Sequence, residues 1–235
     1  SDTMKIYGLQ KTTLVDYPGH VATTLFTGGC NFRCPYCHNG DLVIGLDDIE
    51  PYAMEDIFSH LQKRKGVLDG VVISGGEPTL QTDLPDFIRQ IKELGYLVKL
   101  DTNGTNPTML RSLVEEGLVD YVAMDIKHSR AKYASISHAA DDSLESIAAS
   151  VDYLKEGHVD YEFRTTLCKE LHKETDMTAI GLWLMGAKAY YLQPYKESEQ
   201  VIQPGFHPHD AATLESFVHI LSAFIPKVEI RGFDS

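Results

Sequence analysis

Residues 27–40 read Thr-Gly-Gly-Cys-Asn-Phe-Arg-Cys-Pro-Tyr-Cys-His-Asn-Gly and hold three of the four cysteines of the chain. Cys30, Cys34 and Cys37 are separated by three and then two residues, whereas Cys168 lies far along the sequence. A structural zinc site normally takes four protein ligands, often from two Cys-x2-Cys pairs. The sequence has no second pair, so this loop indicates a metal site in which one position stays open.

Two kinds of metal site fit three such thiolates. Soft thiolates bind zinc, and they are also the usual ligands of iron–sulfur clusters. Three cysteines on a four-iron cluster would leave one iron free for a substrate or cofactor. His38 could complete a zinc site instead, but as the neighbour of Cys37 it is poorly placed to reach the same tetrahedral ion. The spacing favours a cluster and leaves zinc as the alternative.

Outward from this loop, short apolar segments alternate with segments of helical spacing. After a leader, residues 21–26 predict a buried strand, and further strands are predicted at 71–73, 96–100, 120–124, 159–167 and 189–192. Helices are predicted near 53–65, 84–91, 107–114, 144–154, 175–185 and 214–221, with an optional strand at 228–230. Asn106 and Pro107 suit the N-cap and first turn of the third helix.

This alternation of about six strand–helix pairs predicts an α/β fold with parallel strands and right-handed crossovers. An open doubly wound sheet and a complete or partial barrel both satisfy the pattern. In either arrangement, polar residues that end the strands gather at one edge, where such folds bind ligands. The polar strings at 74–78, 101–104 and 125–127 sit at these ends, so we expect a site there.

Composition excludes several classes of protein. With 235 residues, of which 43% are hydrophobic, the chain fits a single domain. Its 21 basic and 34 acidic residues give a net charge of −13, which argues against a nucleic-acid-binding surface. No apolar run approaches the roughly 18 residues needed to span a bilayer, and the first residues lack a signal peptide pattern. These features predict a cytoplasmic protein, in which crowded cysteines bind metal rather than form disulfides.

The cysteine loop and the strand-end strings together resemble the radical S-adenosylmethionine superfamily. Within it the chain is similar to glycyl-radical-enzyme activating proteins, most of all to those of anaerobic ribonucleoside-triphosphate reductase, which are related to pyruvate formate-lyase activating enzymes. The strings that carry the resemblance are Asp16-x-Pro-Gly, Cys-Pro-Tyr-Cys-His-Asn at 34–39, Gly-Gly-Glu-Pro at 75–78, Asp-Thr-Asn-Gly at 101–104, Met-Asp-Ile-Lys at 124–127 and Phe-Arg-Thr-Thr at 163–166.

The resemblance runs from about residue 5 to residue 200 and implies a partial (β/α)6 TIM-like barrel of parallel strands. It implies one domain over 1–235, with a core at about 20–200 and a C-terminal extension at about 201–235. Cys30, Cys34 and Cys37 would hold a [4Fe–4S] cluster whose fourth iron binds the amino and carboxylate groups of S-adenosylmethionine. The partner would be a glycyl radical enzyme, with an anaerobic ribonucleotide reductase expected, and the electron donor a flavodoxin or ferredoxin.

Two strings would contact this cofactor directly. The turn of Gly75, Gly76 and Glu77 offers backbone carbonyls and a carboxylate to the amino group, and its glycines permit a close approach. By resemblance, Tyr36 and His38 face the adenine and ribose. The alternative for the glycine turn is an ordinary strand-to-helix connection.

Three charged residues at strand ends complete the expected site. By resemblance, Asp101 and Asp125 help to bind a monovalent cation, together with backbone oxygens of Thr102 and Ala123. Arg164, inside an apolar strand, needs an anionic partner if it is buried, and the cofactor carboxylate or ribose region would supply one. The alternatives are helix caps for the two aspartates and a structural ion pair for Arg164.

The remaining positions concern the partner and the departures from the family. By resemblance, Asp16 lies near the partner's glycine loop, and Lys127 near that loop or the cofactor. Lys196 stands where the pyruvate formate-lyase relatives carry a histidine that helps to hold adenine. Cys168 could face either the core or the site and is not expected to be a ligand.

Two rival functions stay open. One is a radical S-adenosylmethionine enzyme that acts on a small molecule, similar to 7-carboxy-7-deazaguanine synthase, which shares the short barrel and a Gly-Gly-Glu-Pro turn. The other is a non-enzymatic zinc- or cluster-binding adaptor. The adaptor would leave the strand-end polar strings without a role. The Cys-His-Asn continuation of the cysteine loop and the Asp16-x-Pro-Gly string favour the activase over the small-molecule enzyme without excluding the latter.

Overall fold

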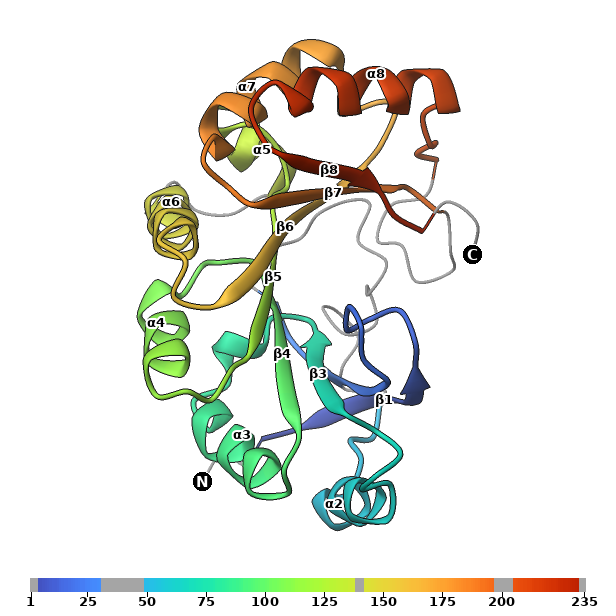
Figure 1. The fold of residues 1–235 in the computed structure, drawn as a ribbon, viewed down its shortest axis with the longest axis vertical. Coiled ribbons are helices and arrows are strands. Elements are labelled where there is room, and N and C mark those ends of the chain that lie inside the picture. The colour runs from blue at the N-terminus through green and yellow to red at the C-terminus, as the bar shows by residue number, and fades with distance from the viewer. Residues whose placement is uncertain (1–3, 31–48, 138–141, 197–204, 233–235) are drawn as a thin grey trace.

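The computed structural model describes residues 4–30, 49–137, 142–196 and 205–232, and its strands form one sheet (Figure 1). In chain order the strands are β1 (Ile6–Thr13), β2 (Ala22–Thr27), β3 (Gly70–Gly75), β4 (Leu97–Thr102), β5 (Tyr121–Asp125), β6 (Asp160–Leu167), β7 (Ala189–Pro194) and β8 (Lys227–Ile230). The strands β2 to β8 confirm the predicted ones, including the optional strand at the C-terminus.

The helices between the strands also fall where the apolar spacing places them. They are α2 (Met54–Lys63), α3 (Leu84–Glu93), α4 (Pro107–Glu115), α6 (Asp142–Lys155), α7 (Glu174–Leu184) and α8 (Ala211–Ser222), with the short elements η2 (Pro78–Leu80), η3 (Arg130–Lys132) and α5 (Tyr133–Ser137). Asn106 caps α4 as predicted, because its side-chain oxygen accepts a hydrogen bond from the Met109 N–H at 3.0 Å.

The strand order decides between the two predicted arrangements. The strands lie side by side in the order β1 to β8, and each pair from β2 to β8 is parallel. Every crossover therefore steps in the same direction, whereas a doubly wound sheet needs a point where the order reverses. The sheet is a partial barrel, and the helices lie on its outer side (Figure 1).

Ahead of residue 21 we predict only a leader and no strand, but residues Ile6–Thr13 form β1. This strand runs antiparallel to β2, with Ile6 opposite Thr27 and Thr13 opposite Ala22. Only the two end residues of β1 are buried, and residues 10–12 are exposed. An edge strand with this burial has no regular apolar alternation for sequence reasoning to detect.

Successive residues of each strand face opposite sides of the sheet. One side is apolar and packs against the helices; on β3, β4 and β5 its residues are Val71, Ile73, Val98, Leu100, Val122 and Met124. The other side, inside the curve of the sheet, carries Lys99, Asp101, Asp125, Glu162 and Arg164. Charged side chains thus line the interior of the barrel, at and below the ends of β4, β5 and β6. In the described part of the chain, no helix is long and apolar enough to cross a membrane.

Candidate active site

The Gly-Gly-Glu-Pro turn after β3 packs against the backbone that leads into the cysteine loop. The Gly76 N–H donates to the Thr27 carbonyl at 3.0 Å, and the Glu77 N–H donates to the Gly29 carbonyl at 2.7 Å. A Cβ atom on Gly76 would lie 2.0 Å from the Gly29 oxygen, and one on Gly75 would lie 2.4 Å from the Thr27 nitrogen. Both glycines are therefore required by this close backbone approach, because any side chain would push the two segments apart.

Glu77 joins the turn after β3 to the turn after β4. Its carboxylate, on a residue only 1% exposed, accepts hydrogen bonds from the Asn103 N–H at 2.7 Å, the Thr102 hydroxyl at 2.8 Å and the Thr79 N–H at 3.1 Å. The Thr79 hydroxyl donates a fourth. Burial raises the pKa of Glu77 above its ordinary value, although these bonds oppose the shift. The carboxylate therefore braces two strand-end turns, a role that the sequence does not reveal.

Asn103 links this brace to the cysteine loop. Its side-chain Nδ2 lies 3.6 Å from the Sγ of Cys30, at hydrogen-bond distance for a sulfur acceptor. Hydrogen bonds to a ligating thiolate orient the ligand and influence the potential of an iron–sulfur cluster. Asn103 enters the sequence analysis only as part of the string at 101–104; its position directly after the end of β4, two residues after Asp101, was the available signal.

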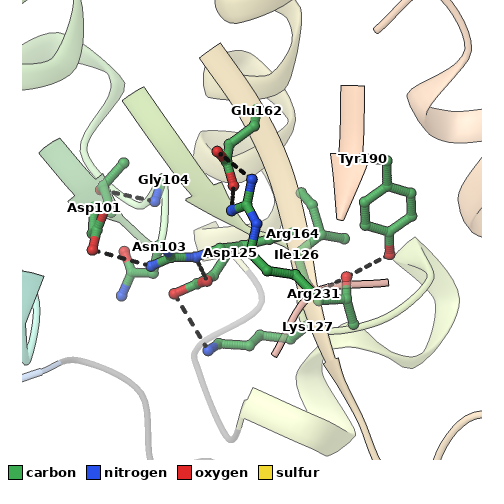
Figure 2. A network of polar contacts seen from close by, with 12 residues as sticks. Asp101, Asn103, Gly104, Asp125, Ile126, Lys127, Glu162, Arg164, Tyr190 and Arg231 are labelled. Atoms are coloured by element: carbon green, nitrogen blue, oxygen red, sulfur yellow. Dashed lines mark hydrogen bonds and ion pairs between the residues drawn. The ribbon is translucent and has the colours of Figure 1, made fainter. Parts of the chain in front are cut away.

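A cluster of charges lies beside the brace, inside the barrel. The Arg164 Nε is 2.8 Å from Asp125 Oδ1, and its Nη2 is 3.4 Å from Asp101 Oδ2. The Lys99 Nζ is 2.6 Å from Asp101 Oδ1, and the Lys127 Nζ is 3.9 Å from Asp125 Oδ2. Figure 2 shows Arg164 between the two carboxylates, with Lys127 on the far side of Asp125. Parallel pairing sets this geometry, because Asp125 is the register partner of Arg164.

Opposite charges within this group favour the ionised forms of Asp101, Asp125 and Arg164. Burial alone would raise the pKa of Asp101, but Arg164 and Lys99 outweigh it and hold the pKa below its ordinary value. Burial has the same effect at Asp125, where Arg164 and Lys127 lower the pKa. Burial opposes the charge of Arg164, but the two carboxylates keep its pKa above the ordinary value. Three cations against two carboxylates leave one net positive charge, which suits a ligand carboxylate.

A second charged group lies next to Arg164. Glu162 on β6 is fully buried and accepts hydrogen bonds from Arg231 at 2.5 and 3.2 Å and from the Tyr121 hydroxyl at 2.7 Å. The Arg231 guanidinium lies 3.5 Å from the centre of the Tyr191 ring. Figure 2 shows Arg231 and Glu162 close to Arg164. Neither Glu162 nor Arg231 was singled out from the sequence, because no motif contains them.

Four of the other candidate residues belong to the part of the cysteine loop that the structure does not describe. Cys34, Cys37, Tyr36 and His38 lie outside the described residues. Among the described residues, no group of three or more His, Cys, Asp and Glu side chains could hold a metal ion. The three cysteine ligands of an iron–sulfur cluster therefore stay a prediction from the cysteine spacing.

Asp16 and Cys168 have contacts of their own. Asp16 lies in the connection between β1 and β2, and its carboxylate accepts a hydrogen bond at 2.6 Å from the hydroxyl of Thr24, in the middle of β2. Cys168 is fully buried in the main core, so its side chain faces the core rather than the site. Lys196 is exposed.

The Radical SAM superfamily is matched over residues 24–178, more than half of the chain. This chain belongs to the radical SAM superfamily. Members of this superfamily use a [4Fe–4S] cluster and S-adenosylmethionine, and the chain is an enzyme of this class. The described part of the site fits these cofactors. The Sγ of Cys30 lies beside the amide of Asn103, and the charged side chains around Arg164 carry one net positive charge.

Individual relatives narrow the comparison. A protein of Methanocaldococcus jannaschii named as a candidate glycyl-radical enzyme activating enzyme, MJ1227, is 34% identical over 198 residues, which cover 83% of this chain and 81% of that protein. The pyruvate formate-lyase-activating enzyme of Clostridium pasteurianum is 33% identical over 129 residues, 53% of this chain. That match spans only 52% of the Clostridium protein.

Solved radical SAM structures share the fold. A domain of pyruvate-formate lyase-activating enzyme from Bacteroides vulgatus superposes with a TM-score of 0.58 at 17% identity, covering 70% of this chain and 99% of that one. SuiB of Streptococcus suis superposes with a TM-score of 0.69 at 14% identity, covering 89% of this chain and 48% of that one. At such identities the likeness concerns the fold, and it confirms the partial barrel.

Proposed function

We propose that this radical SAM enzyme is an activase that generates a glycyl radical on a partner enzyme, and that the partner is an anaerobic ribonucleoside-triphosphate reductase. The observation that carries the activase assignment is the similarity to MJ1227, which extends over four fifths of both chains. Pyruvate formate-lyase-activating enzymes among the relatives point the same way. The choice of a reductase rests on the sequence resemblance described above.

When bound, the iron–sulfur cluster would supply the electron for reductive cleavage of S-adenosylmethionine, the chemistry by which an activase would generate the glycyl radical on its partner. In this proposal Cys30, Cys34 and Cys37 hold the cluster. A flavodoxin or ferredoxin delivers the electron. The side chains described below only bind and orient the cofactor.

The strand-end residues have distinct tasks in this proposal. The turn of Gly75, Gly76 and Glu77 receives the amino group of the cofactor, held in place by the contacts of Glu77 with the next turn. Arg164, held by Asp101 and Asp125, presents a fixed guanidinium to the cofactor carboxylate.

Three further residues complete the proposal. Tyr36 and His38 face the adenine and ribose. Thr102 supports the arrangement through its bond to Glu77.

The test begins with anaerobic reconstitution and electron paramagnetic resonance. We expect a reduced [4Fe–4S] signal that changes when S-adenosylmethionine is added, and cofactor cleavage that is lost in Cys30→Ala, Cys34→Ala and Cys37→Ala. Cys168→Ala is the matched control, because this thiol is buried in the core and should not affect the signal. Wild-type cleavage in any of the three loop variants would contradict the cluster assignment.

The partner is tested separately with candidate glycyl radical proteins. We expect a glycyl doublet on an anaerobic ribonucleotide reductase after incubation with the reconstituted enzyme. Asp16→Asn should lower the yield of this doublet but leave cofactor cleavage without partner unchanged, because the resemblance places Asp16 near the partner's glycine loop and its carboxylate bonds to Thr24 rather than to the strand-end residues proposed to hold the cofactor. Cofactor cleavage with no doublet on any candidate would favour the small-molecule alternative.

A further inference from the structure

The carboxylates expected to bind a monovalent cation already face the cations of the protein. Asp101 Oδ1 is 2.6 Å from the Lys99 Nζ, and its Oδ2 is 3.4 Å from the Arg164 Nη2. Asp125 Oδ1 is 2.8 Å from the Arg164 Nε, and its Oδ2 is 3.9 Å from the Lys127 Nζ. A hard metal cation is bound by oxygen ligands, so an alkali ion would have to displace one of these nitrogen groups. The residues present do not fit such an ion.

Lys99 is the cation that is least able to move away. It lies within β4 and is only 1% exposed, and Asp101, two residues further along, points to the same side of the strand. A buried ammonium group without a partner is strongly unfavourable. The Lys99–Asp101 pair is therefore a fixed part of the barrel interior rather than a surface contact.

The charge balance leads to the same conclusion. Without Lys99, the two aspartates would face only Arg164 and Lys127, and a bound carboxylate would leave one negative charge in excess for an alkali ion to neutralise. With Lys99 in place, the two aspartates and three cations carry one net positive charge, so the carboxylate group of the cofactor needs no alkali ion to balance it here.

We infer that Lys99 is a positioning residue whose ammonium group takes the place of a monovalent cation, so that this chain binds S-adenosylmethionine without an alkali ion. The inference rests on the proposed function only for the placement of the cofactor carboxylate beside Arg164. It does not depend on which protein receives the radical.

The test measures the dissociation constant of S-adenosylmethionine for the reconstituted enzyme by equilibrium dialysis. The salts are potassium chloride, sodium chloride and tetramethylammonium chloride at equal ionic strength. The wild-type affinity should agree within about twofold in all three. Lys99→Met should bind about tenfold more weakly in the tetramethylammonium salt and regain affinity in potassium chloride, because the ion can then occupy the vacated place.

Two further variants make the result specific. Lys99→Arg retains the charge and should remain insensitive to the choice of salt. Lys92→Met removes a lysine that pairs with Asp120 at 2.7 Å outside the site, so the affinity should not change in any salt.

Two results would overturn the inference. One is a wild-type enzyme that loses tenfold or more in affinity when potassium is replaced by tetramethylammonium, a change of about 1.4 kcal/mol. The other is a Lys99→Met enzyme of normal iron content whose affinity does not respond to potassium. Failure to form a glycyl radical on a partner, with these binding results intact, would count against the proposed activase function alone.

Discussion

Replacing Arg231 by Met tests how much the ion pair between Glu162 and Arg231, inside the barrel, contributes to stability. Glu162 is fully buried and accepts hydrogen bonds from the Arg231 guanidinium and the Tyr121 hydroxyl. Removing one partner of a buried ion pair leaves an uncompensated charge and typically costs about 3–5 kcal/mol. Loss of the contact with the Tyr191 ring adds about 0.5–2 kcal/mol. We therefore expect Arg231→Met to lower the free energy of unfolding by about 3 kcal/mol, at the lower end of the range for a buried ion pair because Arg231 is 28% exposed and Arg164 remains close to Glu162.

The assay is urea denaturation followed by circular dichroism. A typical domain is stable by about 5–15 kcal/mol, so this loss should move the midpoint clearly. The double variant Glu162→Gln with Arg231→Met should recover most of the stability, because a neutral amide needs no counter-ion. Arg89→Met is the matched control, since Arg89 pairs with Asp86 and Glu116 at the surface, where ion pairs contribute little.

The same variants have a second readout at the site. Glu162 also acts electrostatically on Arg164, so an unpaired Glu162 should draw Arg164 away from the two aspartates. Affinity for S-adenosylmethionine should fall in Arg231→Met and return in the double variant. The reasoning would be refuted if Arg231→Met were no more destabilising than Arg89→Met, or if Glu162→Gln failed to restore stability.

Three other changes test separate parts of the structure. Gly76→Ala should reduce the iron content after reconstitution, measured colorimetrically, because its methyl group would collide with the Gly29 backbone. Asn103→Leu should make the potential of the cluster more negative in a redox titration, since it removes the amide near Cys30 Sγ. Burial lowers the pKa of His172 from 6.5 to about 4, so the unfolded chain takes up a proton across this window while the folded protein does not. Stability should therefore fall by up to about 3 kcal/mol as the pH drops through it, and His172→Gln should flatten that dependence in urea titrations at several pH values.

Most of the fold was predictable because its signals are local. Each parallel strand is a short apolar run that ends in a polar turn, and each main helix has a regular apolar face, so β2 to β8 follow from the sequence. β1 was missed because its exposed middle breaks any alternation. The choice of a barrel depends on strand order, which local patterns do not contain.

The sequence predicted which short segments form the site, but not which of their residues contact one another. The sequence marks Asp125 and Arg164 as unusual, but their pairing follows from the register of β5 and β6, and register is a property of the assembled sheet. Lys99 and Glu162 are charged residues within strands and belong to no motif, so nothing local shows that they meet Asp101 and Arg231. For Cys34 and Cys37, which lie outside the described residues, the sequence remains the only guide.

The bonds to Glu77 also affect the entropy of ligand binding. Fixing the backbone of one residue costs roughly 1–2 kcal/mol, and a ligand that has to order flexible turns loses that amount of affinity. Here one carboxylate, that of Glu77, accepts two hydrogen bonds from Thr79 within the turn after β3 and two from Thr102 and Asn103 where β4 ends and its turn begins. A ligand at this edge of the barrel therefore meets turns that folding has already ordered. Its binding should show little of the unfavourable entropy that accompanies the ordering of loops.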